Sequence, residues 1–101
     1  MKSIPFDREQ KALAELLRDI RMSVGITQEQ LADSLEWRQT DVSKVERCVR
    51  QIGHLELRHW MAALGMDMMA LEIELEDRLE GLGIAKPTPP GGLRRPRQRL
   101  R

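Results

Sequence analysis

The sequence is poor in cysteine and in aromatic residues. Its 101 residues include one cysteine, three aromatic side chains and no tyrosine. A single cysteine excludes a disulfide within the chain, and a core with so few rings must be built from Leu, Ile, Val, Met and Ala. β-Branched residues are sparse and strong helix formers are abundant, which favours helices over strands. The sequence therefore predicts an all-α protein with one domain.

Long apolar runs and clustered reactive groups are also missing. No stretch approaches the roughly 20 apolar residues that cross a bilayer, and the first residues, MKSIPFDREQ, lack the apolar segment of a secretory signal. We therefore expect a soluble, cytoplasmic protein. Cys48, His54 and His59 do not have the spacing of a zinc site, and no nucleophile–base pair or phosphate-cradling glycine loop is present. We expect no metal, no other cofactor and no enzymatic activity.

Charge is unevenly distributed along the chain, although the net charge is only +1. Residues 86–101 contain six basic residues and no acid, whereas residues 67–85 contain six acids and one arginine. We expect residues 1–6 to be flexible, residues 7–83 to form the domain, and residues 84–101, rich in Pro, Gly and Arg, to be a disordered basic tail. A basic arm on a nearly neutral body suggests a polyanionic partner. The tail fits a nonspecific phosphate-binding arm and a solubilising extension equally well.

Helix signals begin close to the N-terminus. Asp7 is a plausible N-cap for a first helix, and Gly25 supplies the positive φ angle with which helices commonly end. Between them, apolar residues at helical steps form a stripe of Leu13, Leu16, Leu17, Ile20 and Val24. Thr27 and Gln30 have the spacing of a capping box, so a second helix is expected from Gln28.

Two further helices follow a short corner at residues 36–38. The corner contains neither glycine nor proline, so a positive φ angle there would fall on a strained residue. In the third helix, residues 39–47, Val42 and Val45 are expected to face the core while polar residues face outward. A fourth helix is expected over residues 54–64, with a buried face formed by Ile52, Leu55, Trp60, Met61 and Leu64.

The fifth expected helix starts at its cap, Asp67, and has two apolar strips. One strip consists of Leu71, Leu75, Leu79 and Leu82, and the other of Met68, Met69 and Ile73. One strip can cover the core of the domain. The second would leave too much apolar surface in water, so we expect Met68, Met69 and Ile73 to form a homodimer contact.

Several short motifs occur at fixed spacing between residues 13 and 82: Arg21, Gly25, Thr27-Gln28, Leu31-Ala32, the polar run 39–43, Glu46-Arg47-Cys48 and the sequence LGM at 64–66. Through these motifs, residues 13–82 resemble the Cro/repressor (XRE-type) helix-turn-helix family. The resemblance implies a five-helix, lambda-repressor-like domain that binds double-stranded DNA as a homodimer on a two-fold operator and represses transcription. Two residues depart from the family pattern, because Glu36 and Cys48 stand where the family usually has glycine.

The resemblance also implies roles for single residues. Gln28 would donate to a DNA phosphate at the start of the second helix. Gln39, Thr40 and Lys44 would face base edges in the major groove, where Asp41 could accept from a cytosine amino group. Phosphate contacts are implied for Arg38, Ser43, Arg47 and Arg50. Arg21 and Glu46 would form a structural salt bridge between the first and third helices.

Two other functions fit the same pattern. One is an antitoxin-type protein that silences a toxin or another protein partner and regulates its own operon. The other is a controller of a restriction-modification operon. Co-purification of a second protein would identify the former, and the target genes would identify the latter.

Overall fold

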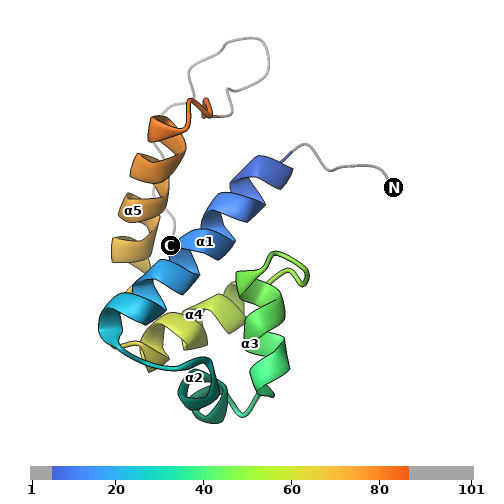
Figure 1. Cartoon of the computed structure of the whole chain (residues 1–101). Coiled ribbons are helices and arrows are strands. Elements are labelled where there is room, and N and C mark those ends of the chain that lie inside the picture. Colours follow the sequence, from blue (N-terminus) through green and yellow to red (C-terminus); the bar gives the residue numbers. More distant parts are fainter. Residues whose placement is uncertain (1–5, 87–101) are drawn as a thin grey trace.

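The computed structural model describes residues 6–86 and folds them into five helices (Figure 1). The helices are α1 (Asp7–Val24), α2 (Gln28–Leu35), α3 (Gln39–Glu46), α4 (His54–Ala63) and α5 (Met68–Gly81). No strand occurs among these described residues, so the prediction of an all-α, five-helix fold is confirmed. Most of the expected flexible N-terminus and of the basic tail lies outside the described residues.

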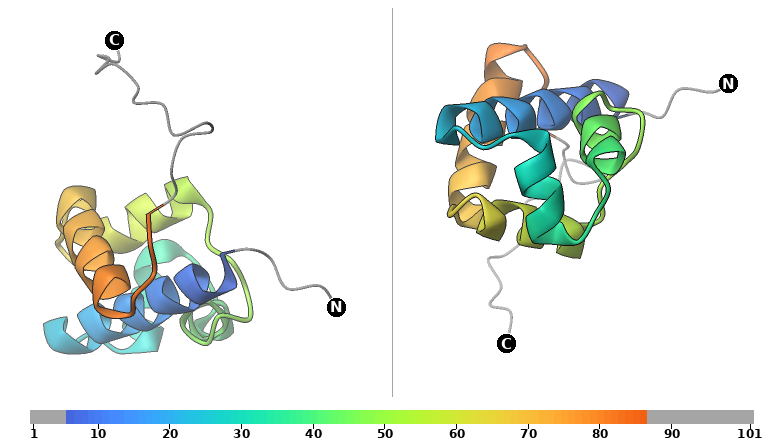
Figure 2. Two further views of the ribbon diagram at one scale, coloured as in Figure 1. Left: turned by 90° about the horizontal axis from the view of Figure 1, so that it is seen from above. Right: turned by 60° about the horizontal axis from the view of Figure 1, so that its bottom comes forward.

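All five helices contribute to one core. The largest fully buried side chains are Leu17 from α1, Leu31 from α2, Val42 from α3, Trp60 and Met61 from α4, and Leu71 from α5. Each such side chain contributes roughly 1.5 to 3 kcal/mol to folding. Arg8 donates to the carbonyl of Leu82 (3.3 Å), so the start of α1 meets the end of α5. These two helices run in opposite directions, and α2 packs against both α3 and α4 (Figure 2).

Side-chain caps fix the starts of two helices as the sequence predicts. Thr27 Oγ1 accepts from the Gln30 amide (3.0 Å) and Gln30 Oε1 accepts from the Thr27 amide (2.9 Å), which completes the capping box of α2. Asp67 accepts from the Ala70 amide (2.8 Å) at the start of α5. The predicted cap of α1 is wrong: Phe6 occupies the N-cap position and makes no side-chain cap bond. Asp7 lies instead in the first turn, where its charge favours the helix dipole.

All five helices end in the same way, with a Schellman motif. In each, one residue adopts a left-handed backbone conformation and donates to the carbonyl three positions back, while the next amide donates to the carbonyl five positions back. The left-handed residues are Gly25, Glu36, Cys48, Gly65 and Gly83. The residues that follow them are all apolar: Ile26, Trp37, Val49, Met66 and Ile84. The corner between α2 and α3 therefore keeps the glycine-type geometry although Glu36 occupies it, with φ of 56°.

Several predicted core positions are wrong. Val24 is 43% exposed because α1 ends there and Ile26 packs against the core after it. Leu55 is 67% exposed, and the buried face of α4 is formed by Leu57, Trp60, Met61 and Leu64. The error arose because Ile52 precedes α4, so counting from it gave the wrong helical phase. On α5, Leu82 is exposed and Met68 packs against the core.

Candidate nucleic-acid interface

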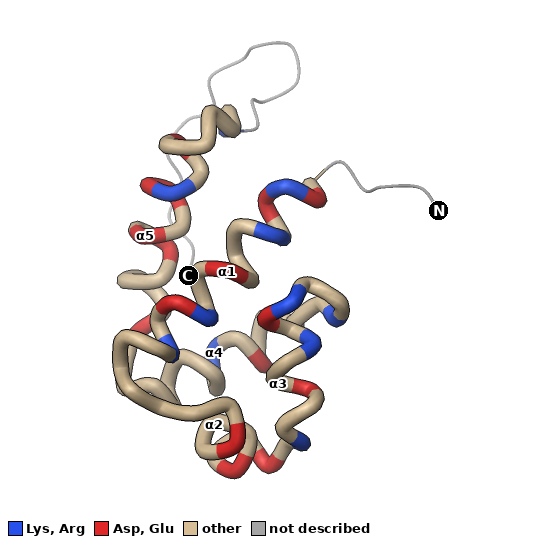
Figure 3. The backbone as a smooth tube through the Cα atoms, in the orientation of Figure 1, with Lys and Arg blue, Asp and Glu red and all other residues tan. Residues whose placement is uncertain are grey.

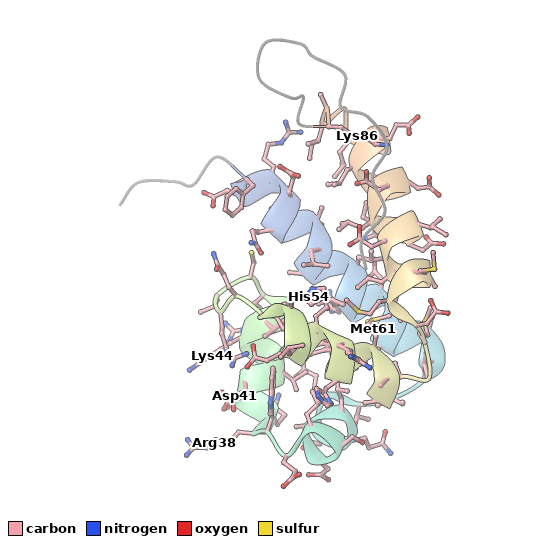
Figure 4. The ribbon with its side chains drawn as sticks, turned by 180° about the vertical axis from the view of Figure 1, so that it is seen from behind. Arg38, Asp41, Lys44, His54, Met61 and Lys86 are labelled. Atoms are coloured by element: carbon pink, nitrogen blue, oxygen red, sulfur yellow. The ribbon has the colours of Figure 1, made fainter. Side chains whose placement is uncertain are left out.

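The α2–corner–α3 unit presents a polar surface on an apolar support. Val42 and Val45 are buried against the core, so the opposite side of α3 faces solvent. Arg38, Gln39, Thr40 and Lys44 are exposed there, while Asp41 and Ser43 are half-buried. Figure 4 shows Arg38, Asp41 and Lys44 on the outer side of α3, away from the body of the domain.

A buried ion pair holds α3 against α1. Arg21 Nε donates to Glu46 Oε2 (2.6 Å) and a second guanidinium nitrogen of Arg21 donates to Glu46 Oε1 (3.0 Å). Both residues are buried, and Arg21 also donates to the carbonyl of Ile26 (2.7 Å). A two-pronged contact of this kind fixes orientation as well as distance. The structure thus contains the inter-helix salt bridge that the family resemblance implies.

Two glutamines extend this ion pair to the surface. Gln28, the first residue of α2, donates to Glu46 Oε1 (2.9 Å), and Gln39, the first residue of α3, donates to Gln28 Oε1 (2.6 Å). The starts of α2 and α3 are therefore joined through side chains. A glutamine amide has two donor hydrogens and an acceptor oxygen. Gln28 retains one N–H, and Gln39 retains one N–H and its carbonyl oxygen, for a ligand.

Asp41 and Ser43 have local partners that the sequence analysis missed. Asp41 accepts from the Arg38 amide (3.2 Å) and so caps α3. The signal was present in the sequence, since an acid three residues after the N-cap commonly reaches back in this way. Ser43 Oγ accepts from Arg47 Nε (3.1 Å), which holds the Arg47 side chain along the end of α3. Capping and base contact thus compete for the carboxylate of Asp41.

Arg50 lies in a separate cluster with Trp37 and Glu56. Its guanidinium carbon lies 4.5 Å from the centre of the Trp37 ring, and a guanidinium nitrogen lies 2.9 Å from Glu56 Oε2. Glu56 also accepts from the Gly53 amide (2.8 Å). The pKa of Glu56 is lowered, mainly by the hydrogen bond from the Gly53 amide and to a smaller extent by the hydrogen bond from the Arg50 guanidinium. Because protein groups engage the guanidinium of Arg50, we leave this residue out of the candidate surface.

Residues 6–86 contain no helix that is long and apolar enough to span a membrane. The same residues contain no group of three or more His, Cys, Asp or Glu side chains placed to hold a metal ion.

Comparisons with known proteins give structural neighbours only. No family model and no curated protein matches the sequence. The clp gene regulator ClgR from Corynebacterium glutamicum is similar at 26% identity, with 69% of this chain and 90% of that chain covered and a TM-score of 0.64. The wild-type restriction-modification controller protein C.Esp1396I is similar at 24% identity, with 71% of this chain and 95% of that chain covered and a TM-score of 0.68. The chain therefore shares the fold of small helix-turn-helix regulators.

Proposed function

We propose that this chain is a sequence-specific DNA-binding transcription regulator of the Cro/repressor (XRE-type) family. The observation that carries the proposal is the bonded series Arg21, Glu46, Gln28 and Gln39. It fixes α3 to the body of the domain and leaves free hydrogen-bonding groups at the surface. A rigid support beneath exposed polar groups is what the reading of base edges requires. The names of ClgR, a gene regulator, and C.Esp1396I, a controller protein, agree with this function.

In the proposed complex α3 lies in the major groove. Gln39, Thr40 and Lys44 face base edges, for which glutamine prefers adenine and lysine prefers guanine. Gln28 donates its remaining N–H to a phosphate at the start of α2, where the helix dipole assists. Arg38, Ser43 and Arg47 flank these positions and contact phosphates, which set the register of the protein on the duplex.

A homodimer would place two such surfaces on a two-fold operator. Met69 and Ile73 are 77% and 62% exposed on one side of α5. Large apolar side chains that are exposed side by side mark a contact with another protein, and we assign this contact to a second copy of the chain. Met68, by contrast, packs on the core of its own domain. Two half-sites about 34 Å apart would then be occupied together, and occupation of a promoter would repress transcription.

The experiment that tests this function compares specific with random DNA. The binding sequence is first selected from a random pool with the full chain. Gln39→Ala should then weaken binding to the selected site by roughly 1 to 3 kcal/mol, about 5- to 150-fold, because a base contact is lost. Affinity for random DNA should barely change.

A matched control uses Gln51, an exposed glutamine in the loop after α3. Gln51→Ala should leave the ratio of specific to random affinity unchanged. Equal losses on both DNAs for Gln39→Ala would contradict a base-reading role, and failure to select any sequence would contradict the function itself.

A further inference from the structure

A hollow lies between residues 7–18 of α1 and the C-terminal end of α3. Its volume is about 570 Å³, and its walls carry three basic side chains: Lys11 and Arg18 from α1, and Arg47 from the end of α3. Buried Ala14 lies between the two α1 cations, and its short side chain leaves room above the helix. None of these α1 residues is implied as a DNA contact by the sequence.

The α1 wall of the hollow is continuous with the candidate interface. Lys11, Ala14, Arg18 and Arg21 follow one another at steps of three, four and three, so they share one face of α1. Arg21 ends this row in its pair with Glu46, to which Gln28 also donates. The hollow therefore begins beside the bonded series that supports α3.

The cations of the hollow are available to a ligand. Among residues 6–86 neither Lys11, Arg18 nor Arg47 lies within ion-pair distance of a carboxylate. Arg47 makes one side-chain bond, to neutral Ser43. The carboxylate of Glu46 in the same wall is neutralised by Arg21. Two acids, Asp7 and Glu15, also border the hollow and oppose an anion there.

We propose that this hollow receives the sugar-phosphate backbone of the DNA that α3 reads, so that α1 is part of the interface. The inference rests on the proposed function and extends it to a sequence-independent contact. Lys11 and Arg18 are seven residues apart, about 10 Å along the helix, and each contacts its own phosphate. Arg47 joins this row to the end of α3.

The first test is the salt dependence of binding by the full chain with Lys11→Gln and Arg18→Gln together. Each lost phosphate contact lowers the magnitude of the slope of log K against log salt by about 0.9. For the double variant we expect the magnitude of this slope to fall by about 1 to 2, and the affinities for selected and random DNA to fall by the same factor. Arg78→Gln removes one charge from α5, where Arg78 pairs with Asp19 away from the hollow, and should leave the slope unchanged.

A second variant should change the affinity for DNA in the opposite direction. Glu15→Gln removes a carboxylate that borders the hollow and should strengthen binding to both DNAs severalfold, because repulsion of the backbone is reduced. If Lys11, Arg18 and Glu15 are only a solvated helix surface, neither the double variant nor Glu15→Gln will change affinity. That outcome overturns the inference while leaving the proposed function intact, whereas absence of DNA binding by the unmodified chain overturns both.

The single cysteine supplies an independent readout of occupancy. Cys48 is exposed and borders the hollow, so saturating DNA should slow its alkylation by a maleimide severalfold. A chain with Cys48→Ser and Glu80→Cys places the thiol at an exposed position on α5 and should react at the same rate with and without DNA. Unslowed alkylation of Cys48 on bound DNA would overturn the inference.

Discussion

Glu36 and Cys48 hold the left-handed conformation that glycine usually occupies at the end of a helix. Their φ angles are 56° and 59°. For residues with a Cβ atom this region costs roughly 1 to 2 kcal/mol. The packing of α2 against α3 and α4 offsets this cost, so the corner keeps its geometry without a glycine.

Glu36→Gly should relieve this strain. We expect the free energy of unfolding to rise by up to about 1 kcal/mol, since part of the gain is offset by the greater freedom of glycine in the unfolded chain. Urea denaturation followed by circular dichroism measures the change. Glu36→Ala removes the same charge but keeps the Cβ atom, and should not show the gain. Equal stabilisation by both variants would assign the effect to charge.

Glu56 is the group for which a pH dependence is expected. The amide of Gly53 and the guanidinium of Arg50 hold the pKa of its carboxyl below the ordinary 4.5. Because the pKa is lower in the folded chain, the ionised Glu56 contributes its full share to stability above about pH 4.5. This contribution is lost as the pH falls through the pKa of Glu56 in the folded state. The stability difference between the unmodified chain and Glu56→Gln should therefore shrink on acidification. A difference that stays constant down to pH 2 would contradict this assignment.

At the level of helices, short sequence patterns predicted where helices begin and end, but they did not predict which side chains contact each other across the fold. Thr27, Gly25 and Asp67 mark helix ends through bonds to neighbours in sequence, which a short pattern contains. The buried face of α4 depends on where the helix starts, so the irregular segment before it shifted the predicted phase. The engagement of Arg50 depends on Trp37, thirteen residues away, and no spacing rule of the sequence specifies that contact.

The apolar side of α5 gives a prediction about assembly. Ile73→Glu should produce a monomer in sedimentation equilibrium and weaken binding to a two-fold site, because a charge would be desolvated in the dimer contact. Leu55→Glu is the matched control, since Leu55 is similarly exposed but lies on α4. It should leave both assembly and DNA binding unchanged. A dimer that survives Ile73→Glu would place the contact elsewhere, and a second, different protein bound to α5 would favour the antitoxin-type alternative.

On the scale of the whole molecule, charges are sorted by region. Acidic residues lie along α5 and α2, while basic residues lie around α3 and in the loop after it (Figure 3). A polyanion approaching the domain is therefore directed to the side of α3 and repelled from α5. The proposed dimer contact and the proposed reading surface thus differ in charge as well as in position.

The basic tail gives a prediction at this scale. Deletion of residues 86–101 removes six positive charges and should reduce the slope of log K against log salt by about 0.9 for each phosphate that they contact. Fluorescence anisotropy with random DNA at several salt concentrations measures the slope. An unchanged slope together with lower solubility would identify the tail as a solubilising extension.

The contact between the two tryptophans has a spectroscopic consequence. Trp37, in the corner, and buried Trp60 of α4 meet edge to face, with ring centres 6.1 Å apart, and the guanidinium of Arg50 lies over the Trp37 ring. They are the only tryptophans of the chain, which has no tyrosine. All intrinsic emission excited near 295 nm therefore originates at the junction of the corner with α4. Unlabelled protein thus carries its own optical probe of that junction.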